Sequence, residues 1–110
     1  MPQHWELNAL DIQPHAPLVV STSDEARTIV LQLPAGESLQ EHQVHERAWV
    51  LVLTGEVEIG TPDGGQRISG GPGLLTEFAP QERHDVRARE DARLLLWLAP
   101  WPGVGHPSRR

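Results

Sequence analysis

Short apolar stretches rich in β-forming residues recur every eight to twelve residues along the chain, and Gly and Pro residues separate them. Few segments place apolar residues at helical spacing, whereas alternation and short continuous apolar runs are frequent. Evenly spaced strands between turn formers are typical of an all-β sandwich or barrel. The pattern predicts strands at residues 5–10, 18–21, 27–33, 39–44, 48–53, 56–60, 66–68, 74–78, 85–88 and 93–98.

Length and composition favour one small folded domain. The chain has 110 residues, about the size of a single domain, and 38% of them are hydrophobic, so a core can form. We expect residues 1–26 to pack on or extend a barrel formed by residues 27–98. Residues 99–110 contain three Pro and two Gly, which predicts an irregular tail. Residues 61–65, Thr-Pro-Asp-Gly-Gly, predict a hairpin turn.

Charge and residue usage exclude several classes of function. The formal net charge is -6, so nucleic acid and anionic membranes are disfavoured as partners. The chain contains no Cys and no Lys, which excludes thiolate metal sites, thiol nucleophiles and Schiff-base chemistry. No apolar run approaches the roughly 18 residues of a membrane span, and the first residues show no signal pattern, so we expect a cytoplasmic protein. Five arginines alternate with apolar residues or flank turns, which predicts a solvated face: Arg47, Arg83, Arg87, Arg89 and Arg93.

Two of the predicted strands are apolar on both faces. Residues 48–53 read Ala-Trp-Val-Leu-Val-Leu, and residues 94–98 read Leu-Leu-Leu-Trp-Leu. A closed barrel covers only one face of each strand, and soluble monomers rarely expose large apolar patches. The second face is therefore expected to meet another sheet, the N-terminal segment or a second subunit, and we favour a homodimer.

Three of the six histidines lie within or beside predicted strands, namely His42, His45 and His84. The stretch before the first two begins at Gly36, and the stretch before the third begins at Gly73 and contains Pro80. Because the chain has no Cys, a metal site would use imidazole and carboxylate ligands.

These two stretches resemble the two motifs of the cupin family. The first family motif runs Gly, five residues, His-x-His, three or four residues, Glu, six residues, Gly; the second runs Gly, five residues, Pro-x-Gly, two residues, His. Here Gly36, five residues and His42 match, but Val44 stands at the second His and Ala48 at the Glu, counting back from Gly55. In the second motif, Pro80 and His84 match in kind with altered spacing, and the Gly after Pro is missing.

The resemblance extends over roughly residues 27–98. It implies an all-β double-stranded β-helix, also called a cupin or jelly-roll barrel, which is often dimeric and holds a metal or a small molecule. The simplified motifs are most like those of short stand-alone cupins.

One hypothesis is a divalent transition metal, Zn, Ni, Fe, Cu or Mn, held by His42, His84 and a third ligand. His45 is the natural third ligand, but residues three apart on a regular strand face opposite ways, so a bulge or turn must intervene. Such a bend could instead bring in Glu46, which we rank slightly below His45. A metal of this kind would support an enzyme whose reaction the sequence does not identify.

The alternative hypothesis is a metal-free binding or sensing cupin with a small-molecule ligand. Its interior pocket is predicted on the side of the chain that carries Val44, Ala48, Val50 and Val52. The Ala at the family's Glu position favours this alternative, because the site then loses its usual anionic ligand.

Overall fold

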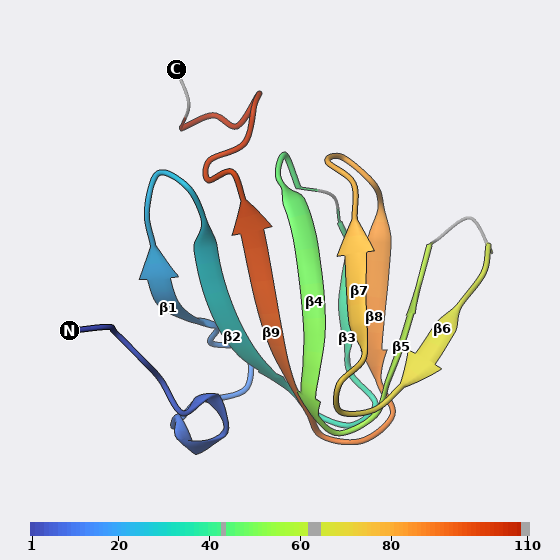
Figure 1. Cartoon of the computed structure of the whole chain (residues 1–110). Helices are drawn as coiled ribbons and strands as arrows, with labels where there is room; N and C mark the ends of the chain where they lie inside the picture. Colours follow the sequence, from blue (N-terminus) through green and yellow to red (C-terminus); the bar gives the residue numbers. More distant parts are fainter. Residues whose placement is uncertain (43, 62–64, 109–110) are drawn as a thin grey trace.

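A computed structural model describes residues 1–42, 44–61 and 65–108, and for residues 40–42 only the backbone. Two antiparallel sheets face one another, as Figure 1 shows. The five-stranded sheet has, in order, β1 (Leu18–Thr22), β2 (Arg27–Leu33), β9 (Ala92–Ala99), β4 (Arg47–Thr54) and β7 (Leu75–Phe78). The four-stranded sheet has, in order, β3 (Ser38–His42), β8 (His84–Ala88), β5 (Val57–Gly60) and β6 (Ile68–Gly70). The predicted all-β class is confirmed.

The prediction of a strand at residues 5–10 is wrong. Residues Leu7–Ala9 form a 3-10 helix, η1, closed by a hydrogen bond from the Ala9 N–H to the Glu6 carbonyl. The Arg93 guanidinium donates to the carbonyls of Leu7 and Leu10, at 2.8 and 2.9 Å. These carbonyls are therefore satisfied by a side chain rather than by a neighbouring strand. Arg93 is half-buried by this contact and does not belong to a fully solvated face.

The remaining predicted strands are present, with small shifts at their ends. The largest shift is in β6, which begins at Ile68 and pairs antiparallel with β5 over Val57–Ile59. This pairing confirms the hairpin that the turn at residues 61–65 predicted. The turn residues 62–64 themselves lie outside the described residues.

The core lies between the two sheets. Along β4 the buried residues Ala48, Val50 and Val52 alternate with half-buried Trp49 and Leu51. The first three belong to the main hydrophobic cluster, which also takes residues from β2, β5, β8 and β9. The inner face of the five-stranded sheet is thus covered by the four-stranded sheet.

The outer face of the five-stranded sheet is covered in part by the N-terminal segment. Val30 and Ile12 are buried but lie outside the main core cluster. Val30 is paired with Leu95, whose neighbour on the same face of β9 is Arg93, the residue that holds η1. The N-terminal segment therefore covers part of the outer face of this sheet, whose strands were predicted to be apolar on both faces.

The other part of the outer face is not covered by any residue that the structure describes. Residues of β4, β7 and β9 line an apolar groove of about 320 Å³, which we call the outer groove: Trp49, Leu51, Leu75, Leu95 and Trp97. The Trp49 and Trp97 rings lie 5.5 Å apart on paired positions of β4 and β9.

No helix in the described part of the chain is long and apolar enough to cross a membrane. The cytoplasmic location stays a prediction.

Candidate functional site

The predicted site residues come from one end of the two sheets. His42 is the last residue of β3, and its backbone is paired with His84, the first residue of β8. The register of β3 shifts between Leu39 and His42, and the chain then turns before β4 begins at Arg47. The chain bends at His45 and Glu46, consistent with the bulge or turn that was expected after His42. The side chain of His42 lies outside the described residues.

His84 is the one described histidine that is fully buried, with 2% of its surface exposed. Its ring stacks on Phe78 at a centroid separation of 4.0 Å and an interplanar angle of 14°. Its Nδ1 lies 3.2 Å from the Glu82 carbonyl oxygen, which can only accept, so Nδ1 carries the proton and donates. The lone pair of a neutral His84 is then on Nε2, the nitrogen that could accept a hydrogen bond or coordinate a metal.

A small inner cavity of about 10 Å³ lies beside His84. A space of this size holds about one water molecule or ion. Its other lining residues are all aliphatic: Leu31, Leu39, Val50, Val86, Leu94 and Leu96. Of the predicted pocket residues, Val50 lines this cavity. Ala48 and Val52 are buried in the core cluster, and Val44 is partly buried and packs against that cluster.

Glu46 and His45 both contact the C-terminal segment. Glu46 is 1% exposed, and its Oε2 accepts a 2.6 Å hydrogen bond from the Gly103 N–H. His45 Nδ1 lies 2.6 Å from Gln81 Nε2, so the amide donates to the imidazole. The His45 ring also meets His106 edge-on at 5.6 Å. Each candidate for a third metal ligand therefore already has a partner at the end of the chain.

The C-terminal segment, residues 100–108, packs across this end of the sheets. Trp101 packs against the core cluster, and the Arg27 guanidinium lies 3.9 Å from the centre of its ring. The ring of His106 contacts the Trp101 ring at 5.0 Å. A Cβ on Gly103 would lie 2.6 Å from the His45 carbonyl oxygen, so only glycine fits there without movement. The segment lacks helix and strand, yet its position is set by specific contacts.

Sequence reasoning missed Trp101, Gly103 and Arg27 as residues that shape this end of the fold. The tail was predicted from its Pro and Gly content, which reports backbone irregularity and says nothing about docking. The usable signal was Trp101, because a large aromatic side chain gains most of its stabilisation by burial.

Among the described residues, no group of three or more His, Asp or Glu side chains could hold a metal ion. His45, Glu46 and His84 are all described, so these three do not form a site by themselves. A site that includes His42 lies outside the described residues. The ligand set of His42, His84 and His45 or Glu46 therefore stays a prediction.

A separate charged cluster lies on the four-stranded sheet. Arg67 donates hydrogen bonds to Asp85 and Glu58. The bond to Asp85, and then that to Glu58, raises the pKa of Arg67 above its ordinary value because both stabilise the charged guanidinium. Arg67 therefore stays charged and links the β6 side of the sheet to β5 and β8.

Comparison with protein-family models gives no match for this sequence, and no curated protein matches it. Solved structures do match. An RmlC-like cupin protein from Desulfovibrio desulfuricans is 26% identical, with a TM-score of 0.76 over 91% of this chain and 97% of that one. A cupin superfamily protein from Desulfitobacterium hafniense is 19% identical, with a TM-score of 0.74 over 90% of this chain and 94% of that one.

An enzyme is also among the matches. The DMSP lyase DddQ from Ruegeria pomeroyi is 24% identical, with a TM-score of 0.64 over 70% of this chain but only 39% of that one. The sheet order and these matches define a double-stranded β-helix, as predicted. The chain has the fold of a small cupin, and the two family motifs that it resembles are retained only in part.

Proposed function

We propose that this cupin is a binding or sensing module that takes a small organic ligand on the inner side of its sheets, where the side chains around the inner cavity of about 10 Å³ must move apart to admit it. The observation that supports this proposal most is that the Glu46 carboxylate already accepts a structural hydrogen bond. Among the described residues, Glu46 is the one buried carboxylate, and it accepts a hydrogen bond from the Gly103 backbone. A reaction that uses a carboxylate as its base or its anionic metal ligand would draw on such a residue, and Glu46 is already engaged in a structural hydrogen bond.

The surroundings of His84 fit the same proposal. The Nδ1 of His84 donates to the Glu82 carbonyl, which fixes the orientation of the ring beside the aliphatic side chains of the inner cavity. One oriented polar group in an apolar wall is the usual composition of a small-molecule site.

A divalent metal, Zn, Ni, Fe, Cu or Mn, is the second candidate. The direct cross-strand pairing of His42 with His84 favours it. A metal-binding histidine commonly donates its other ring nitrogen to a carbonyl or carboxylate, as His84 Nδ1 does. The third ligand would be His45 or Glu46, which would first have to leave Gln81 or Gly103. Such a metal would make an enzyme possible.

Elemental analysis of the untagged protein, purified without chelators, separates the two candidates. We expect far less than one metal ion per chain, and no rise after incubation with these ions followed by desalting. About one ion per chain would contradict the proposal, because structural and catalytic sites of this kind bind tightly. If His84→Ala then lost that ion tenfold or more while the Glu82→Ala control kept it, the metal candidate would be established.

We also propose that a second copy of the chain covers the outer groove. Trp97 and Leu75 are 48% and 59% exposed there, and the groove borders an Arg47–Glu77 ion pair with a 2.9 Å separation. In a two-fold interface each copy presents the same surface, so an apolar centre with both a cation and an anion at its edge can be self-complementary. Exposed tryptophans are typical centres of such interfaces.

Replacing Trp97 by Glu is expected to convert the dimer to a monomer at micromolar concentration. Two buried carboxylates, one from each copy, would face the apolar groove without partners, at a cost well above 1 kcal/mol each. Sedimentation velocity would measure the change. Leu18→Glu, an exposed site on edge strand β1, is the control that should leave the dimer intact. A wild-type chain that sediments as a monomer at all concentrations would contradict the proposal.

A further inference from the structure

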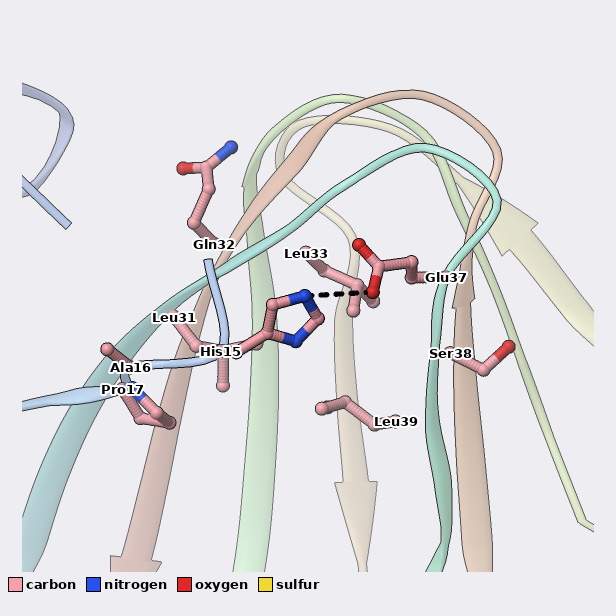
Figure 2. A pocket seen from close by; sticks show the side chains of 9 residues that line it. All are labelled: His15, Ala16, Pro17, Leu31, Gln32, Leu33, Glu37, Ser38 and Leu39. Atoms are coloured by element: carbon pink, nitrogen blue, oxygen red, sulfur yellow. Dashed lines mark ion pairs between the residues drawn. The ribbon is translucent and has the colours of Figure 1, made fainter. Parts of the chain in front are cut away.

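A second cavity opens at the side of the fold, between β2 and β3. This lateral cleft has a volume of about 80 Å³ and is shown in Figure 2. Leu31 and Leu33 of β2 and Leu39 of β3 form its apolar wall. Glu37 lies at its rim on the loop that joins the two strands. The cleft is separate from the end of the sheets that the C-terminal segment occupies.

Residues 15–17 lie across the lateral cleft, and we call them the cover. The backbone of His15 has a φ of +65°. Residues other than Gly rarely adopt this conformation, but His adopts it more often than most. In Figure 2 its ring points toward Glu37, and its Nε2 lies 3.0 Å from Glu37 Oε1. The His15 and Glu37 side chains are 70% and 40% exposed. An exposed pair of this kind contributes about 0–1 kcal/mol, so a ligand can displace His15 at little cost.

The lateral cleft and the inner cavity share two wall residues. Leu31 and Leu39 line both spaces. Rotation of these two leucines would therefore join the side opening to the space beside His84. The cleft is the described cavity that offers a route to His84 from the side of the fold rather than from the end that Trp101 and Gly103 occupy.

The charge in the lateral cleft selects the chemistry of a ligand. Glu37 is the one carboxylate among the lining residues, and Gln32 and Ser38 add neutral polar groups. A carboxylate beside three leucines favours a cation with a short alkyl body over an anion of the same size.

We propose that the lateral cleft binds a short aliphatic amine, with the ammonium on Glu37 and the alkyl group against Leu31, Leu33 and Leu39. The cavity has about half the volume of a cavity of ~150 Å³ that holds the six carbons of benzene, so an alkyl end of about three carbons fits. This site does not depend on what the inner cavity binds, or on whether His84 holds a metal.

The test is an NMR titration of the full chain with isobutylammonium chloride, followed through leucine methyl signals. Saturable shifts at Leu31, Leu33 and Leu39 are expected, and sodium isobutyrate should bind at least tenfold more weakly. Glu37→Gln should weaken binding of the amine about fivefold, as expected for a partly exposed charge. Shifts that do not saturate, or equal binding of the amine and the acid, would overturn the proposal.

A pair of tryptophan substitutions, one in the cover and one just before it, provides the matched control. Ala16 is exposed and lines the lateral cleft, so Ala16→Trp should fill the opening and weaken amine binding tenfold or more without disturbing the core. Gln13 is exposed in the same segment but does not line the cleft, so Gln13→Trp should bind as the wild type does. Unchanged binding in Ala16→Trp would overturn the assignment of the ligand to this cleft.

Discussion

Replacing Gly55 by Ala is expected to lower the free energy of unfolding by about 4 kcal/mol, through backbone strain and steric overlap together. Gly55 has a φ of +84° in the turn after β4. A Cβ at this position would lie 2.3 Å from the Asp91 carbonyl oxygen and 2.7 Å from the Ala92 Cα. Both are backbone atoms at the start of β9, so neither can move aside without disturbing the strand.

The measurement is urea denaturation followed by tryptophan fluorescence. Gly36→Ala is the matched control, because Gly36 has the same φ of +84° but no atom within 4 Å of its Cβ position. That variant should cost only the conformational strain, about 1–2 kcal/mol. Equal losses in the two variants would show that the close approach of Asp91 contributes nothing to the fold.

Replacing Glu46 by Ala is expected to cost about 3 kcal/mol and to release the C-terminal segment. The Gly103 N–H donates to a buried carboxylate, and hydrogen bonds to charged groups contribute more than neutral ones. Without the acceptor, the Gly103 amide is left unpaired unless the segment moves into water. We expect the segment to move, because few described hydrogen bonds hold residues 100–108 to the sheets.

Hydrogen exchange separates release of the segment from global unfolding. In Glu46→Ala, the amides of residues 101–106 should exchange at least tenfold faster, while those of β4 and β9 change no more than the loss of global stability requires. Glu82→Ala is the control, because Glu82 also accepts from a backbone N–H, that of Ala79, but is exposed. Gly103→Ala should release the same segment, so the double variant should cost less than the sum of the two. Unchanged exchange at residues 101–106 would contradict this role for Glu46.

The site was predictable in part. The spacing of Gly36 and His42 and the position of His84 after Pro80 placed the two histidines near each other, and the backbone pairs them across β3 and β8. The partners of His45 and Glu46 were not predictable, because they come from Gln81 and Gly103, 36 and 57 residues away in the chain. Arg93 was misassigned for the same reason, since its acceptors on η1 lie 83 and 86 residues away.

The sequence by itself determined the approximate positions of the strands from residue 18 onward and the inward side of β4. These are local properties, because alternation along a strand decides which side chains can share a core. Only the tertiary structure decided what happens to the outer faces of these strands: the N-terminal segment covers the face at Val30, whereas Trp97 in the outer groove stays exposed. It also decided that Glu46 accepts a hydrogen bond from the C-terminal segment. Such contacts join groups that are far apart in the sequence. A local sequence pattern does not predict which of these groups the fold brings within hydrogen-bonding or van der Waals distance.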